Sequence, residues 1–441
     1  MKPDDVYKWD AHSDQPHVIK DKRIKWALYR KGFWGTIKTF LTLFSMPIIG
    51  IKLLVTPRTR VGQKINMIGL CVNVDTPLPE KKPVSDLELR DMVTELQVQN
   101  IQIRIPLSDI ESLQVYIDLI KTFEDRSILV NILQDRRHID DPVLLQQSLD
   151  EIFKALHGRV THVQVGNAVN RRKWAFISLD EYFRFFGVAQ QLRDQKYPNL
   201  KLLGSGIIDF ELPNFARSVF HGYPIKYDAA AALLYVDRRG APENTQIFCD
   251  LITKINWFYE MARYSTKCAT QLWITETNWP LIDTEPFAPA SGNCLVNEQL
   301  QAAYLVRYFL LAIASGNVEK CFWHQLIAPG YGLVDNRGDE LRKRAAYYSY
   351  KTLIRLVDGG VVLTFTRNAD GVYRLMLRNS RGLVEACWVD AGEGAVPISP
   401  DQHAIDHQGM PVSNSDGDSL RVTQEVVYLL DHAFVCDRHE H

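Results

Sequence analysis

"SILVNILQDRRHIDDPVLLQQSLDEIFKALHGRVTHVQVGN", residues 127–167, contains the unit that decides the fold. Two short apolar runs, 127–133 and 160–167, flank a longer run with helical period, Leu144–Leu156. The pair Asp141-Pro142 opens that longer run with proline at the first helical position. A strand, a crossover helix and a second strand in this order are typical of a parallel sheet.

The same rhythm continues on both sides of this unit. Six further apolar runs are separated by helical stretches, at 65–74, 100–106, 200–208, 227–236, 270–277 and 318–326. Eight strand–helix units in about 290 residues predict a (β/α)8 barrel. The rival is a doubly wound open sheet, which usually carries a glycine-rich phosphate loop after its first strand. "GLCVNVDTPLP", residues 69–79, is no such loop, so the barrel is favoured.

Local signals set the expected helix starts and the domain limits. Three S-x-x-E pairs predict capping boxes: Ser85/Glu88, Ser108/Glu111 and Ser178/Glu181. After residue 360 the period changes to short alternating strands split by turn residues, which predicts a β-sandwich-like antiparallel domain. We therefore expect an N-terminal extension (1–60), a barrel (61–359) and a C-terminal β-domain (360–441).

The N-terminal extension is basic and partly apolar. Residues 1–60 contain 12 Lys and Arg against five Asp, whereas the whole chain has a net charge of −1. The apolar core Thr39–Ile51 is shorter than the about 20 residues that a bilayer span needs, and Pro47 and Gly50 disfavour a continuous helix. Residues 20–55 therefore predict attachment to an anionic membrane surface. The alternatives are an extension packed on the body and a single-pass anchor.

The composition limits which other partners, metals and cofactors are expected. Because the net charge is near zero, nucleic acid is not expected as a partner. The seven cysteines are dispersed, without C-x-x-C or Cys/His ligand spacing, so we expect no metal and no cofactor. Dispersed thiols and an opening "MKPDD" unlike a signal peptide predict a cytoplasmic protein, peripheral on the inner face of the membrane. The sequence does not indicate an oligomeric state.

Polar and aromatic side chains follow the predicted strands, at the end where barrel enzymes carry their active sites. They include Arg104, Asn131, Asp135, Asn167, Asn170, Asp209, Glu211, Tyr235, Asp237, Glu276, Asn278, Trp279, Trp323 and His324. Hydroxyl groups of a sugar need hydrogen-bond partners, and its apolar faces stack on rings. The predicted rim therefore suits a carbohydrate.

Two of these strand ends carry motifs. "WITETNWP", residues 273–280, resembles the strand-7 nucleophile motif of the retaining (β/α)8 glycoside hydrolases, the clan with catalytic Glu residues after strands 4 and 7. "VQVGNAVN", residues 163–170, is similar to the strand-4 motif of endo-galactanases and plant-type β-glucanases. The likeness covers roughly residues 62–360, and the trailing β-domain resembles that of xylosidase-type members.

The resemblance implies a role for each matching residue. Glu276 would be the nucleophile, with Arg104 and Tyr235 holding it ionised and oriented. Asn167 would bind the sugar 2-hydroxyl, with Asn170 beside it. Trp279 and Trp323 would stack on the sugar.

The acid/base position departs from the pattern. Ala168 stands where the clan has Glu, so no strand-4 side chain can protonate the leaving group. Asp209 and Glu211 are the first candidates for a replacement acid, followed by Asp237 and Asp135. The first hypothesis is a retaining-type glycosidase acting on a glycan or glycolipid. The alternatives are a carbohydrate-binding pseudoenzyme in envelope polysaccharide or lipopolysaccharide assembly, and a transglycosidase.

Overall fold

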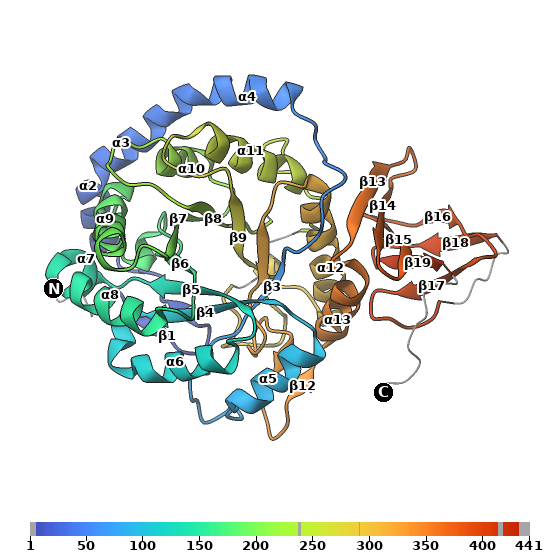
Figure 1. The fold of residues 1–441 in the computed structure, drawn as a ribbon, viewed down its shortest axis with the longest axis horizontal. Helices are drawn as coiled ribbons and strands as arrows, with labels where there is room; N and C mark the ends of the chain where they lie inside the picture. The colour runs from blue at the N-terminus through green and yellow to red at the C-terminus, as the bar shows by residue number, and fades with distance from the viewer. Residues whose placement is uncertain (1–5, 237–239, 291, 413–417, 432–441) are drawn as a thin grey trace.

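The computed structural model describes residues 6–236, 240–290, 292–412 and 418–431. Figure 1 shows a barrel of strands ringed by helices, with N-terminal helices along one side and a β-domain on another. The barrel is closed in the order β10-β3-β4-β5-β6-β7-β8-β9, and every neighbouring pair is parallel. The predicted (β/α)8 barrel with a C-terminal β-domain is confirmed.

The barrel elements fall close to the predicted runs. The strands are β3 (Ile68–Cys71), β4 (Asn100–Pro106), β5 (Ser127–Leu133), β6 (His162–Val165), β7 (Lys201–Ile208), β8 (Ala229–Leu233), β9 (Leu272–Thr277) and β10 (Lys320–Trp323). The surrounding helices are α5 (Asp86–Glu95), α6 (Leu113–Thr122), α8 (Pro142–Leu156), α9 (Leu179–Lys196), α10 (Leu212–Val219), α11 (Leu251–Tyr264), α12 (Glu298–Ser315) and α13 (Ala345–Val357). The short helix α7 (Arg136–Asp140) precedes α8.

Side-chain size along the strands fills the barrel. On β4, residues such as Ile103 alternate outward into the main core shared with the helices. A separate apolar cluster includes Ala229, Ala231, Trp273 and Phe322. The alternation places this cluster inside the barrel, where the alanines of β8 leave room for the two large rings.

The capping predictions succeed at one site of three. Ser85 and Glu88 form the predicted capping box at α5. Ser108 and Glu111 instead lie in a 3-10 segment, Leu107–Ser112, and α6 begins only at Leu113. Ser178 precedes α9 without a side-chain cap, and the Glu181 carboxylate accepts hydrogen bonds from Arg136 and the Ile177 amide in place of the Ser178 amide.

The N-terminal segment covers both the mouth and the side of the barrel. A hairpin, β1 (Trp9–Asp10) and β2 (Gln15–Pro16), leads to α2 (Lys22–Lys31), α3 (Phe33–Leu41), a 3-10 turn (Thr42–Ser45) and α4 (Met46–Val55). The α-helix is interrupted by the 3-10 turn directly before Met46, and Pro47 lies in the first turn of α4, where its missing N–H is tolerated. The expected interruption near Pro47 is therefore present, whereas Gly50 lies inside α4 without a break. Phe33–Val55 forms one 23-residue segment that is long and apolar enough to cross a membrane, longer than the predicted core.

The C-terminal domain is an antiparallel sheet with a smaller two-stranded sheet. The main sheet has the order β13-β14-β15-β19-β17, and β16 pairs with β18. Their bounds are β13 (Val361–Arg367), β14 (Val372–Asn379), β15 (Gly382–Val389), β16 (Gly394–Pro397), β17 (Gln402–Asp406), β18 (Ser419–Val422) and β19 (Val427–Asp431). A two-stranded sheet, β11 (Val334–Asp335) with β12 (Arg342–Lys343), precedes α13.

A buried polar cluster joins this domain to the barrel. The Glu243 carboxylate accepts hydrogen bonds from the Arg307 guanidinium of α12 and from the Trp388 indole N–H of β15. Arg307 is fully buried, and it also donates to the Gln424 carbonyl at 3.2 Å. The cluster therefore ties three parts of the chain at one point.

Candidate active site

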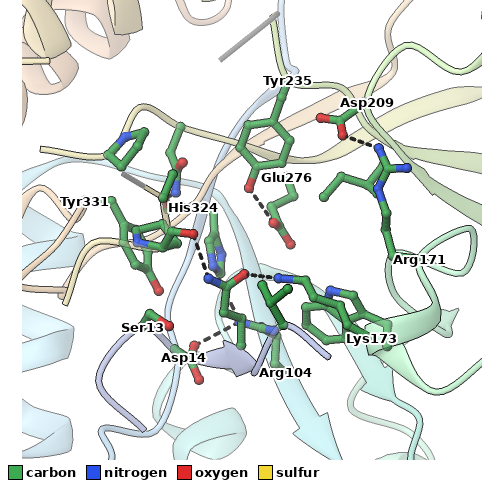
Figure 2. Close-up of a pocket in the computed structure, with 18 residues that line it drawn as sticks. Ser13, Asp14, Arg104, Arg171, Lys173, Asp209, Tyr235, Glu276, His324 and Tyr331 are labelled. Atoms are coloured by element: carbon green, nitrogen blue, oxygen red, sulfur yellow. Dashed lines mark hydrogen bonds and ion pairs between the residues drawn. The ribbon is translucent and has the colours of Figure 1, made fainter. Parts of the chain in front are cut away.

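A pocket of about 410 Å³ opens at the C-terminal ends of the barrel strands. Figure 2 shows polar side chains from several strand ends converging on it. It is lined by Ser13, Asp14, Gln15, Val18, Arg104, Arg171, Lys173, Trp174, Ile208, Asp209, Tyr235, Glu276, Asn278, Pro280, Pro289, Ala290, His324 and Tyr331. Of the predicted site residues, Glu276, Arg104, Tyr235 and Asp209 lie together in this lining.

Glu276 is the most organised carboxylate of the pocket. It lies near the end of β9 and is 7% exposed. The Tyr235 hydroxyl donates a hydrogen bond to its Oε1, and the Asn167 amide donates to its Oε2 at 3.4 Å. Asn167 is itself held by the Asn131 amide, which donates to its oxygen at 3.0 Å. Two donors on two oxygens fix the plane of the carboxylate.

The surrounding charges keep Glu276 ionised. Burial alone would raise the pKa of its carboxyl, but His324, Arg104 and the two donors lower that pKa by more, so it lies below its ordinary value of 4.5. Burial lowers the pKa of His324 despite the attraction of Glu276, so the ring is neutral near pH 7. The lasting positive charge beside Glu276 is therefore that of Arg104, which is 4% exposed.

The N-terminal hairpin supplies a wall of the pocket that the sequence did not predict. Arg104 donates to the Asp14 carboxylate at 2.9 Å (Figure 2). Gln15 accepts from Lys173 at 2.6 Å and donates to the Pro289 carbonyl at 2.8 Å. The hairpin therefore bridges the ends of β4, β6 and β9. Its strands have two residues each, and so short a segment carries no periodic signal.

The strand-4 position, where the clan has its acid, carries no carboxyl group and is buried. Ala168 is fully buried, with a φ of +46°, and it belongs to an apolar cluster with Leu133, Trp174, Ile208 and Leu233. The Trp174 ring also lines the pocket. The methyl group of Ala168 therefore packs beneath the pocket wall and does not face an open slot.

The two candidate replacement acids have different surroundings. Asp209 lines the pocket and forms an ion pair with Arg171 at 2.5 Å. Glu211 lies outside the pocket lining, where it binds Arg171 and accepts from the Asn170 and Asn214 amides at 2.8 and 2.5 Å. Three donors leave Glu211 little freedom to act as an acid. The structure brings Asp209, and not Glu211, into the pocket.

The remaining predicted residues divide between the core and a supporting layer. Asn170 binds Glu211 and the backbone of Ile208, and therefore supports the rim. Asp135 caps α7 and bonds to His138, away from the pocket lining. Asp237 lies outside the described residues.

The two tryptophans that were predicted to stack on a sugar are buried and lie outside the pocket lining. Trp279 and Trp323 are 1% and 0% exposed and stack on each other with ring centroids 6.2 Å apart. The Trp279 indole N–H donates to the Gly240 carbonyl at 3.1 Å. The aromatic rings that do line the pocket are Trp174, Tyr235 and Tyr331. Trp174 and Tyr331 are 6% and 2% exposed and Tyr235 is half-buried, so these three rings offer part of a face or an edge to a sugar in the pocket.

The described residues contain no candidate metal-binding cluster. Across the described ranges, no group of three or more His, Cys, Asp or Glu side chains is placed to hold a metal ion. The charged groups that line the pocket are Asp14, Asp209 and Glu276 together with Arg104, Arg171 and Lys173. The arrangement suits acid–base and nucleophilic chemistry on a polar ligand.

No family model and no curated protein sequence matches this chain. Solved structures do match it. A family 39 glycoside hydrolase from Bacteroides cellulosilyticus aligns with a TM-score of 0.64 at 14% identity, covering 83% of this chain and 81% of its own. A family 39 β-xylosidase from Caulobacter crescentus aligns with a TM-score of 0.57 at 11% identity, covering 85% and 98%.

A xylanase of glycoside hydrolase family 30, subfamily 8, from Clostridium acetobutylicum aligns with a TM-score of 0.53 at 10% identity, covering 84% of this chain and 96% of its own. All three identities are low, so the likeness shows the fold. The chain has the barrel and β-domain architecture of glycoside hydrolases of families 39 and 30.

Proposed function

We propose that the protein acts on a glycan or glycolipid by a retaining glycosidase mechanism with Glu276 as the nucleophile. The observation that carries the proposal is the setting of Glu276, a buried carboxylate that Tyr235 and Asn167 orient and Arg104 keeps ionised. A nucleophilic carboxylate must be ionised and fixed in this way before it can attack an anomeric carbon. The shared fold supports a carbohydrate as the ligand.

The missing strand-4 acid restricts the leaving group. A Glu276 oxygen would form a bond to the anomeric carbon while the bond from that carbon to the leaving oxygen breaks. Without a proton donor, the leaving group keeps the electron pair and departs as an anion, which a phosphate does readily and an alkoxide does not. Water then hydrolyses the glycosyl ester and gives its proton to Asp209 or to solvent. General acid help is worth about 10²- to 10⁴-fold, so sugars on poor leaving groups would react slowly.

An apolar groove beside the pocket supports a glycolipid in particular. This groove, of about 560 Å³, is lined by apolar side chains that include Phe40, Leu43, Phe210 and Ile247. Glu211 also lines it, and the ion-paired Arg171 joins Glu211 to the pocket. A ligand with a sugar head and an apolar tail would find both kinds of surface within one region.

The second candidate is a carbohydrate-binding pseudoenzyme. The packing of Ala168 into an apolar cluster favours it, because the strand-4 position carries no carboxyl group and its methyl group is buried among apolar side chains. A third candidate is a transglycosidase, in which a sugar hydroxyl replaces water in the second step.

Covalent trapping tests the proposal. We expect 2-fluoro glycosides with dinitrophenolate or fluoride leaving groups to leave one glycosyl adduct on Glu276, which mass spectrometry of a digest would locate. Glu276→Gln should give no adduct and should still bind sugar. Sugar binding without an adduct across a broad panel would favour the pseudoenzyme, and new glycosides formed in preference to free sugar would favour transfer.

A further inference from the structure

The N-terminal helices expose a long run of apolar side chains. We call residues 22–55, from the start of α2 to the end of α4, the strap. Its exposed apolar residues are Trp26, Tyr29, Phe33, Trp34, Phe40, Leu41, Leu43, Phe44, Ile48, Ile51, Leu54 and Val55. Phe44 is 82% and Leu54 86% exposed. A contiguous apolar surface of this kind marks an interaction site on a soluble domain.

The opposite side of the strap is fitted to the barrel. A Cβ added at Gly35 would lie 2.7 Å from the Ser178 Cβ, so only glycine permits this approach. Ile49 is 3% exposed, and Lys38 forms an ion pair with Asp180 at 2.9 Å. Of its helices, α3 lies beside α10 and α4 beside α11 (Figure 1). A helix with two apolar sides needs two apolar environments, and the barrel provides one of them.

Charge indicates the second environment. Six basic side chains are exposed at the start of the strap and in the two residues before it, beside one acidic residue, Asp21: Lys20, Lys22, Arg23, Lys25, Arg30 and Lys31. None of the six forms an ion pair within the described part of the chain. Cationic side chains next to exposed aromatic and aliphatic ones match the headgroup region of an anionic bilayer.

A barrel loop extends the same surface. Phe248 is 98% and Ile247 72% exposed, in the segment between β8 and α11. Ile247 lines the groove that Phe40 and Leu43 of the strap also line, so the two apolar surfaces are continuous.

We propose that the strap docks the protein on an anionic lipid bilayer, with its helices in the plane of the interface and their inner side on the barrel. A second copy of the chain fits the surface less well. A two-fold contact would place the same patch of each copy against the other, and residues 22–55 contain no acidic side chain to pair with the basic cluster of the second copy. The inference does not depend on Glu276 chemistry.

Docking would also position the pocket. The hairpin that contributes Asp14 and Gln15 to the pocket wall is only a few residues from the strap. Its bonds to Arg104, Lys173 and the Pro289 carbonyl hold it on the mouth of the barrel. The bilayer would therefore lie beside the pocket, at a fixed orientation to it.

Vesicle flotation of the full chain tests the proposal. We expect binding to vesicles that contain phosphatidylglycerol, weakening with added salt, and little binding to phosphatidylcholine alone. Phe44→Glu and Leu54→Glu should each lower the partition coefficient about tenfold, from the apolar area that each side chain loses. Alanine at Lys22, Arg23 or Lys25 should cost about fivefold each.

Leu87→Glu is the matched control, because Leu87 is 67% exposed on α5 and lies outside the strap. It should bind vesicles like the parent, and all variants should melt alike. Three results would overturn the proposal: no binding to anionic vesicles, equal loss with Leu87→Glu, or a dimer in solution that Phe44→Glu dissociates. Protein that an alkaline wash fails to release from the vesicles would show a spanning segment instead. These outcomes are independent of the adduct on Glu276.

Discussion

Restoring a carboxyl group at Ala168 tests how the site departs from a complete glycosidase. Ala168→Glu adds four heavy atoms to a fully buried position within an apolar cluster. Overpacking a core costs about 1–3 kcal/mol, and a buried polar group without a partner costs about 1–3 kcal/mol more. We therefore expect the free energy of unfolding to fall by about 2–6 kcal/mol. The φ of +46° adds no new strain, because Ala168 already adopts it.

The same burial should make the new group a proton donor. Desolvation raises the pKa of a carboxyl group, so Glu at position 168 would stay protonated nearer to neutral pH. A positioned general acid accelerates departure of a poor leaving group by about 10²- to 10⁴-fold. The assay is hydrolysis of phenyl and dinitrophenyl glycosides of the sugar that labels Glu276. The gain should appear with phenol and be small with dinitrophenol, which leaves without a proton.

Ala168→Gln separates packing from acidity, since it has the same size and no acidic proton. It should lose similar stability and gain no activity. The reasoning is refuted if Ala168→Glu folds, still forms the adduct on Glu276 and yet hydrolyses the phenyl glycoside no faster than the glutamine variant. A wild-type melting temperature for both variants would refute the packing part, because the cluster would then have room to spare.

Three further predictions follow from the contacts of the site and the domain junction. Because the pKa of Glu276 is depressed, its ionised form and the stability it confers should persist to below pH 4.5 and be lost as the pH falls through that folded-state pKa. Tyr235→Phe removes a hydrogen-bond donor to the carboxylate, so it should move the acid limb of a pH–rate profile up by about one pH unit or more. Asp209→Asn should slow phenyl glycosides more than dinitrophenyl glycosides if Asp209 donates the proton, and equal effects on both would remove it from that role. Glu243→Ala leaves the buried Arg307 without its carboxylate partner and should lower the free energy of unfolding by about 3–5 kcal/mol in a denaturant melt. Glu393→Ala, which removes an exposed ion pair of the C-terminal domain, should cost under about 1 kcal/mol.

The barrel and part of the site were predictable from the sequence. Each strand is a short apolar run between helical stretches, and that alternation needs no knowledge of distant contacts. Glu276 and Tyr235 were predictable because strand order places both at one end of a barrel. Their hydrogen bond then follows from the fold.

What failed depended on packing between elements. Trp279 lies near a strand end, and a tryptophan at such a position is compatible with either the pocket rim or the core. Its packing against the rings of Tyr304 and Tyr308 on α12 places it in the core. Asp14 lies 90 residues before its partner Arg104 and within no periodic pattern. Glu211 looked like Asp209 in the sequence, but Arg171 and two amides hold it outside the pocket lining.

The pairing of Asp14 with Arg104 bears on how the site could be controlled. The resemblance gives this arginine to the nucleophile, whereas here its guanidinium donates to the hairpin and acts on Glu276 through charge. The hairpin lies a few residues before the strap, so a displacement of the strap would be transmitted along the chain to Asp14. If the hairpin moved, the Arg104 guanidinium would lose its hydrogen bond to the Asp14 carboxylate. It would then pair with another nearby anion, either the Glu276 carboxylate or an anionic group of the ligand. The hairpin therefore sets both the pocket wall and the charge near Glu276, and the proposed membrane contact would be linked to the pocket through the ion pair of Asp14 with Arg104.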